Sequence, residues 1–117
     1  MLLISAFTMR THCHGPLTAC KSNCKNLATA LEMYASDNRG QYPASLESLI
    51  PGNYLKSLPT CPGAQSMSYT DYHAFNHRTH FRFSCVGNNH GNAYTGFSAD
   101  STNYPRYDAE EGLLDHP

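Results

Sequence analysis

The sequence predicts an α+β fold, built from two helices and a small antiparallel sheet. Apolar and small residues recur at steps of three and four over about residues 17–37, which is the spacing of one helix face. Further along, Phe81, Phe83 and Cys85 alternate with polar residues, as in a strand with one buried face. These two periods define the main helix and the sheet of the predicted fold.

Length, charge and hydropathy restrict the class of protein. A chain of 117 residues has room for one compact domain, and a net charge of −1 gives no basic surface for nucleic acid. The longest apolar run, Met1–Ile4, is far shorter than the about 20 residues that cross a bilayer. We therefore expect a flexible leader or remnant over 1–16 and one domain over 17–117, with no nucleic-acid partner and no membrane span in the chain as written.

The first helix is expected to be amphipathic and to end at a specific turn. Leu27, Leu31 and Tyr34 lie on its apolar face, and we assign them as the interaction face of the helix. The run Asp37–Gly40 ends the helix, because Asn38 or Gly40 can adopt the left-handed conformation that closes one. This face is predicted to lie on the sheet.

The remaining elements are shorter. A second helix is expected over about 45–50, with Ser45 as N-cap because its hydroxyl can accept a hydrogen bond from a free backbone N–H. Strands over about 67–75 and 79–86 are predicted to pair as a hairpin.

Residues 88–117 show no periodicity and are expected to form a long, irregular, loop-rich tail. We expect aromatic side chains to hold this tail against the domain. The residues assigned to that role are Tyr94, Phe97, Tyr104 and Tyr107.

One ordered series of motifs resembles a known family. The run from Cys20 to Tyr34 is followed by Asp-Asn-Arg-Gly-Gln-Tyr-Pro at 37–43 and by Tyr-Leu-Lys-Ser-Leu-Pro at 54–59. In order and spacing, residues 17–62 resemble the globular part of type IV pilin-like proteins, which include the pseudopilins of type II secretion. The resemblance implies a bacterial structural subunit outside the cytoplasm, in an extracellular filament or secretion apparatus, whose partners are copies of itself or related pilin-like subunits.

The beginning of the sequence departs from that family. Pilin-like subunits carry a leader cleaved before a phenylalanine, followed by about 20 apolar residues with a glutamate near their start. Here Ala6-Phe7-Thr8-Met9 is followed by the polar run 10–16. We therefore expect a pilin-like domain without the usual hydrophobic helix, whose export route is not evident. It is either a fragment or paralogue that lacks the helix, or a subunit that packs through other contacts.

Cysteines suggest an oxidised protein. Five cysteines with no C-x-x-C pair favour disulfides over a structural zinc site. Cys61 and Cys85 are expected to meet at the base of the hairpin, and a bridge closing a loop of about 25 residues would contribute roughly 3 kcal/mol. The alternative is two buried free cysteines. Cys20 and Cys24 are interpreted as small core residues, or as a partner for Cys13 or for a second subunit.

Histidines and acids offer further metal ligands. His73, His77 and His80 lie around the predicted hairpin turn, and His12, Cys13 and His14 are consecutive donors for zinc or copper. Neither group has the spacing of a structural zinc site, so surface histidines are the favoured interpretation. Calcium has candidate oxygen ligands in the acidic tail, but without EF-hand spacing a solvated acidic face is expected. Those ligands are Asp100, Asp108, Glu110 and Glu111.

An enzyme is not expected. Cys85 with His90 is the one conceivable pair of nucleophile and base, but a cysteine at the end of an apolar strand is expected to be buried, and no oxyanion hole is evident. The sequence therefore predicts a pilin-like structural or surface-interaction domain without a cofactor. The alternative is a small secreted, disulfide-stabilised binding module that holds metal through histidines.

Overall fold

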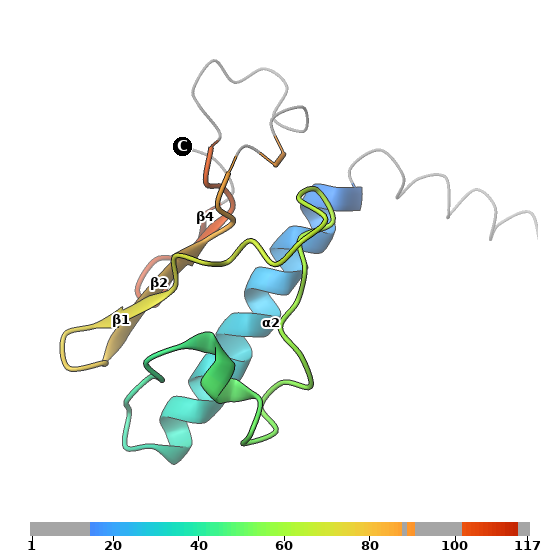
Figure 1. Ribbon diagram of the computed structural model, residues 1–117. Helices are drawn as coiled ribbons and strands as arrows, with labels where there is room; N and C mark the ends of the chain where they lie inside the picture. Colours follow the sequence, from blue (N-terminus) through green and yellow to red (C-terminus); the bar gives the residue numbers. More distant parts are fainter. Residues whose placement is uncertain (1–14, 88, 91–101, 115–117) are drawn as a thin grey trace, which may run out of the picture.

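The chain folds as one long helix beside a four-stranded antiparallel sheet, which confirms the α+β class (Figure 1). The computed structural model describes residues 15–87, 89–90 and 102–114. Within that part of the chain, no helix has both the length and the apolar character needed to cross a membrane. The sheet and a short 3₁₀ helix, η1, both pack against the long helix, α2.

Helix α2 spans Gly15–Asp37 and buries the face that the spacing predicts. The turn after Asp37 closes the helix as expected. In this turn Gly40 has a left-handed φ of +80°, and its N–H donates to the Ala35 carbonyl over 2.8 Å. Leu27 and Leu31 are fully buried, and Tyr34 packs edge-on against Tyr54. These three residues face the chain's own core, so Leu27 and Leu31 offer no surface to another subunit.

The second helix differs from its prediction. It is the single 3₁₀ turn η1, Leu46–Leu49, and the Ser45 side chain makes no capping hydrogen bond. The Ser45 hydroxyl lies 3.4 Å from that of Ser48 instead. Leu46 and Leu49 anchor the turn by burial in the core, so packing rather than a cap holds this segment.

The sheet is a four-stranded meander in the order β1-β2-β3-β4. The predicted hairpin is confirmed by β1, His73–Phe75, which pairs with β2, His80–Ser84, although both strands are shorter than expected. The expectation of an irregular tail is wrong over its last part. Strand β3, Arg106–Asp108, pairs with β2, and β4, Gly112–Leu114, pairs with β3.

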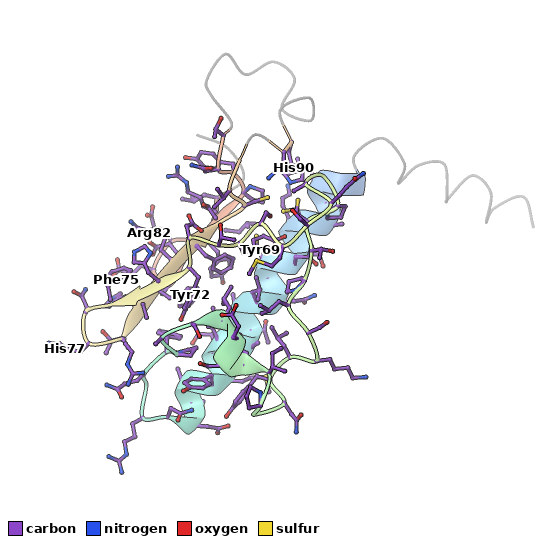
Figure 2. The ribbon with its side chains drawn as sticks, in the orientation of Figure 1. Tyr69, Tyr72, Phe75, His77, Arg82 and His90 are labelled. Atoms are coloured by element: carbon purple, nitrogen blue, oxygen red, sulfur yellow. The ribbon has the colours of Figure 1, made fainter. Side chains whose placement is uncertain are left out.

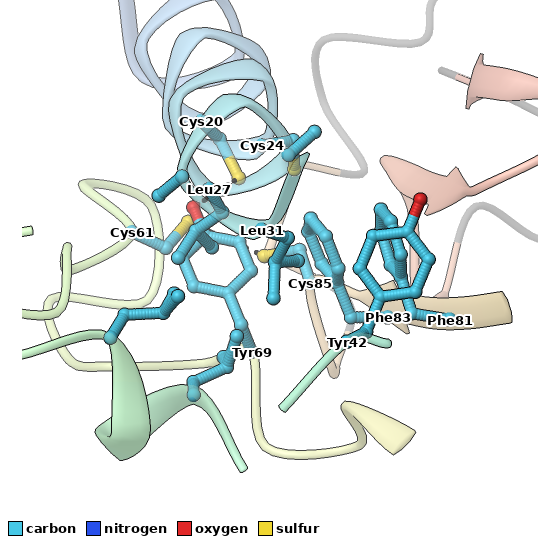
Figure 3. Packing of buried hydrophobic residues seen from close by; sticks show 14 of the residues in the cluster. Cys20, Cys24, Leu27, Leu31, Tyr42, Cys61, Tyr69, Phe81, Phe83 and Cys85 are labelled. Atoms are coloured by element: carbon cyan, nitrogen blue, oxygen red, sulfur yellow. Dashed lines mark hydrogen bonds between the residues drawn. The ribbon is translucent and has the colours of Figure 1, made fainter. Parts of the chain in front are cut away.

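Stacked aromatic rings fill the space between the sheet and α2 (Figure 3). Tyr107 lies parallel to both Phe81 and Phe83, with ring centroids 5.9 Å apart in each pair. Tyr42 packs edge-on against Phe81 at 4.7 Å. The role expected of Tyr107 in holding the tail is therefore confirmed, whereas Tyr94 and Phe97 lie outside the described residues.

Asp108 stabilises the turn between β3 and β4. Its carboxylate accepts hydrogen bonds from the Glu110 N–H at 2.8 Å and from Arg82 Nε at 2.9 Å. Burial opposes ionisation of this carboxyl, but these hydrogen bonds outweigh it, so the pKa of Asp108 is lowered. Asp108 thus has a structural role in the sheet, and Asp100, the other main calcium candidate, lies outside the described residues.

We expect Leu31→Asp to unfold the domain, because it places a charge on the fully buried face of α2. The expected loss is at least roughly 4 kcal/mol, from lost packing and an unpaired buried carboxylate. Met33 lies on the same helix but is 52% exposed, so Met33→Asp is the matched control and should change stability little. Urea unfolding followed by circular dichroism compares the two, and equal midpoints would show that the buried face is misassigned.

Candidate metal centre

Four buried side chains from distant parts of the chain converge beside the aromatic core. They are Cys20 on α2, Cys61 in a turn, Cys85 directly after β2, and His90 in the loop that follows. Their ligand atoms all lie within 4.8 Å of one another. Figure 3 shows the three cysteines gathered against α2, and Figure 2 shows His90 near the first turns of that helix.

The cysteines reach this point through local structure. Cys20 lies on the buried face of α2, one turn from Cys24. Cys61 opens a tight turn in which its N–H donates to the Ser66 carbonyl over 2.9 Å, while its carbonyl accepts from the Gln65 N–H at 2.7 Å. Backbone hydrogen bonds therefore fix the position from which the Cys61 side chain points inward.

Cys85 and His90 are placed by the end of β2 and the loop after it. Cys85 continues the inward alternation of the strand, and its N–H donates to the Pro105 carbonyl over 2.9 Å. Gly87, at a φ of +105°, turns the chain back toward the core. A side chain on Gly63 would lie 2.8 Å from His90 Cε1, so glycine there leaves room for the imidazole.

The spacing of the donors suits a tetrahedral metal ion. His90 Nε2 lies 3.2 Å from Cys61 Sγ and 3.7 Å from Cys85 Sγ, and the two sulfurs are 3.4 Å apart. Zinc bound to sulfur at about 2.3 Å and to nitrogen at about 2.0–2.1 Å places its ligands about 3.5–3.8 Å from one another. The ligand atoms of Cys61, Cys85 and His90 therefore stand close to the separations of a zinc site, and Cys20 Sγ lies within 4.8 Å of each of them.

Neighbouring polar groups hydrogen-bond the sulfurs. Cys85 Sγ accepts from Asn89 Nδ2 at 3.2 Å and lies 3.1 Å from the Ser68 hydroxyl. Cys20 Sγ lies 3.1 Å from the hydroxyl of Tyr69, which itself accepts from Asn23 Nδ2 at 3.3 Å. Such partners orient ligands and spread the negative charge of thiolates.

Without a metal, Cys20 and Cys85 favour the neutral thiol. The hydrogen bond with Cys20 and burial raise the pKa of Cys85 to about 11. The hydrogen bond with Cys24 is the main cause that raises the pKa of Cys20, and burial adds to it. Neutral buried thiols are poor nucleophiles, which argues against a Cys85–His90 catalytic pair. A divalent cation would supply the charge that makes thiolates favourable here.

The disulfide expected between Cys61 and Cys85 is not formed in the structure. Both residues are free thiols, and their sulfurs are 3.4 Å apart, against about 2.05 Å in a disulfide. The sequence correctly brings these two residues together at the base of the hairpin. The two sulfurs belong to a larger group of buried ligand atoms that also includes Cys20 and His90.

The histidines expected as possible ligands do not gather. His73 and His77 are exposed, and His73 Nδ1 contacts the Asp71 carbonyl at 3.2 Å. His80 Nε2 instead lies 2.9 Å from a carboxylate oxygen of Glu110. The second group, His12, Cys13 and His14, lies outside the described residues.

A separate groove of about 550 Å³ lies between η1 and the segment that leads to β1. The hydroxyl of Tyr72 donates to the Pro43 carbonyl at 2.7 Å, and that of Tyr69 is engaged by Cys20. Glu47 is the only carboxylate among its lining residues, so the groove presents no acid–base pair. The lining residues are Ala44, Ser45, Leu46, Glu47, Leu58, Met67, Tyr69, Thr70 and Tyr72.

Fold and cluster together define a small α+β protein with a buried site of three cysteines and one histidine. Comparisons of the chain with protein-family models, with curated proteins and with solved structures find no match. The chemistry of the cluster is therefore the main guide to function.

We expect metal binding at this cluster to weaken in acid. Because the pKa values of Cys20 and Cys85 are raised, both thiols are protonated at neutral pH and must lose their protons to bind a metal. Each proton that is released on binding makes the apparent affinity for zinc fall about tenfold for each pH unit of acidification. The two thiols together therefore give a fall of roughly 100-fold per pH unit. Zinc titrations across the neutral range, in buffers of different ionisation enthalpy, measure this release. A pH-independent affinity would place the metal away from these thiols.

Proposed function

We propose that this chain is a non-enzymatic structural domain whose fold is held by a zinc ion bound through Cys20, Cys61, Cys85 and His90. The observation that carries the proposal is the convergence of four buried ligand atoms within 4.8 Å. Sites with four protein ligands and at least two thiolates are typical of structural zinc, because no coordination position is left for substrate. The proposed role of the zinc ion is therefore to stabilise the fold, and not to catalyse a reaction.

Such a site would join three parts of the fold at one point. Cys20 belongs to α2, Cys61 to the turn after η1, and Cys85 and His90 to the end of β2 and its loop. Structural zinc binding contributes about 10–16 kcal/mol in small zinc domains, which is comparable to the whole stability of a typical domain. One ion at this junction would thus fix the helix against the sheet.

Zinc fits this donor set better than the hard cations. Thiolates and imidazole favour zinc or other soft and intermediate metals, whereas calcium and magnesium prefer oxygen ligands. Zinc is also redox-inert and accepts a tetrahedral site without strain. The site uses none of the exposed histidines at 73, 77 and 80, so the histidine-bound metal of the alternative sequence interpretation is replaced by a thiolate-rich one.

We further infer that this zinc-held domain is a pilin-like structural subunit. A specific contact supports this second inference: the Tyr42 hydroxyl donates to Glu32 on α2 over 2.9 Å, and the Tyr42 N–H donates to the Arg78 carbonyl over 2.7 Å. The pilin-like motif at 37–43 therefore fastens the end of the helix to the β1–β2 turn. On this proposal the partners are copies of the chain or related subunits outside the cytoplasm, in a filament or secretion apparatus.

The zinc proposal is tested by titrating the reduced chain with zinc and with cobalt. The unaltered chain is expected to bind one equivalent and to show the ligand-field bands of tetrahedral cobalt bound to thiolates. Cys85→Ala should weaken binding by more than about 100-fold, because loss of an outer partner alone typically costs 10–100-fold.

Two matched controls separate the cluster from other donors. Cys24→Ala removes a buried cysteine of the same helix face that is not one of the four ligands, and because Cys24 hydrogen-bonds Cys20, this variant should weaken binding less than Cys85→Ala does. A triple alanine variant of His73, His77 and His80 should keep the affinity of the unaltered chain. Binding that survives in Cys85→Ala, or that disappears in the histidine variant, would contradict the zinc proposal.

A further inference from the structure

The three sulfurs of the cluster differ in their hydrogen bonds. Cys85 Sγ contacts Asn89 Nδ2 and the Ser68 hydroxyl, and Cys20 Sγ contacts the Tyr69 hydroxyl. Among the described residues, Cys61 Sγ contacts only other members of the cluster, at 3.2 Å from His90 Nε2 and 3.4 Å from Cys85 Sγ. Hydrogen bonds to a thiolate stabilise its charge and lower its nucleophilicity. Cys61 is therefore the most nucleophilic sulfur of a zinc-loaded site.

We propose that Cys61 is an oxidation site for hydroperoxides, and that its oxidation produces a Cys61–Cys85 disulfide and releases the zinc. This inference rests on the zinc site proposed above. Geometry selects the partner, because Cys85 Sγ lies 3.4 Å away and each sulfur needs to move by less than about 1 Å to reach bonding distance. Both residues are held by backbone hydrogen bonds on either side of the base of the hairpin.

The reaction balances with the hydroperoxide as the only oxidant. The Cys61 thiolate attacks one peroxide oxygen and the O–O bond breaks, which leaves a sulfenic acid on Cys61 and a hydroxide (or alkoxide) that takes a proton from solvent. The Cys85 thiolate then attacks the Cys61 sulfur, the S–O bond breaks, and the departing hydroxide is protonated to water. Two electrons pass from the two sulfurs to the peroxide, and the zinc loses two of its four ligands.

Oxidation would change which segments are tied together. Zinc joins α2 to the Cys61 turn and to the end of β2, whereas the disulfide joins only the turn and the strand. Cys20 and His90 remain as two ligands, too few for a structural zinc site. The expected result is that α2 is no longer joined at Cys20 to the Cys61 turn and to the end of β2.

An oxidant would approach the cluster past Val86 and Asn89, which are next to Cys85 and His90 in the chain. Val86 is 38% exposed and Asn89 is half-buried, while the sulfurs behind them are fully buried. The Asn89 side chain also donates to the Val86 carbonyl over 2.8 Å, so one local contact holds this cover in place. We expect a peroxide to reach the sulfurs past Val86 and Asn89 when such local contacts open.

The test treats the zinc-loaded chain with hydrogen peroxide and follows zinc release with a chromogenic chelator. We expect one zinc released per chain, one disulfide mapped to Cys61 and Cys85 by peptide mass spectrometry, and recovery of zinc binding after treatment with a thiol reductant. A dimedone trap added during the reaction should label Cys61. Removing the hydrogen bonds to Cys85, in a Ser68→Ala and Asn89→Ala double variant, should shift part of that label to Cys85.

The outcomes distinguish this inference from the zinc proposal. If the untreated chain binds no zinc, both fall. If it binds zinc but retains it in peroxide, or if the disulfide or the label is found on Cys20, the oxidation site is wrong and the structural zinc stands. Cys24→Ala is the control and should still release zinc and form the Cys61–Cys85 disulfide in peroxide, because Cys24 is not one of the four ligands.

Discussion

The packing of this protein depends on a constraint at one point: three thiols and an imidazole are buried together where the helix, a turn and the end of a strand meet. Burying polar groups is unfavourable unless each finds a partner. Here the partners are the other members of the cluster and hydroxyl or amide groups beside it, such as Tyr69 and Ser68. A zinc ion would be coordinated by all four side chains at once. This coordination would offset the free-energy cost of burying them, so the cluster would stabilise the fold.

The need for such a junction follows from the size of the elements around it. Strands β1, β3 and β4 have three residues each, and β2 has five, so few ladder hydrogen bonds hold the sheet. The stack of Phe81, Phe83 and Tyr107 supplies an apolar layer against α2, but on one side of the sheet only. Small folds with short strands commonly add a metal or disulfides to reach useful stability. The cluster lies at the end of this layer, where the strands end.

Local patterns predicted the local elements well, and the site poorly. Steps of three and four gave α2, and the alternation through Phe83 gave β2, because both signals come from residues close in sequence. The β3–β4 hairpin was missed because three-residue strands are too short to show a period. The four-residue cluster was missed because Cys20 lies on another element and Cys61 lies 24 positions before Cys85 and 29 before His90, so no fixed spacing signals the set. Cys61 and Cys85 were expected to meet, but proximity alone does not distinguish a disulfide from a shared metal.

The proposed zinc site also changes what the cysteine count indicates about the location of the protein. Five cysteines in a short chain suggest an oxidising compartment, but the proposed zinc site would use three of them as thiolates, so the proposed location rests on the pilin-like resemblance alone. The most direct test of the central claim is X-ray absorption at the zinc edge of the zinc-loaded chain. The expected first shell is three sulfurs at about 2.3 Å and one nitrogen at about 2.0–2.1 Å. A shell of only nitrogen and oxygen would contradict the zinc site of Cys20, Cys61, Cys85 and His90.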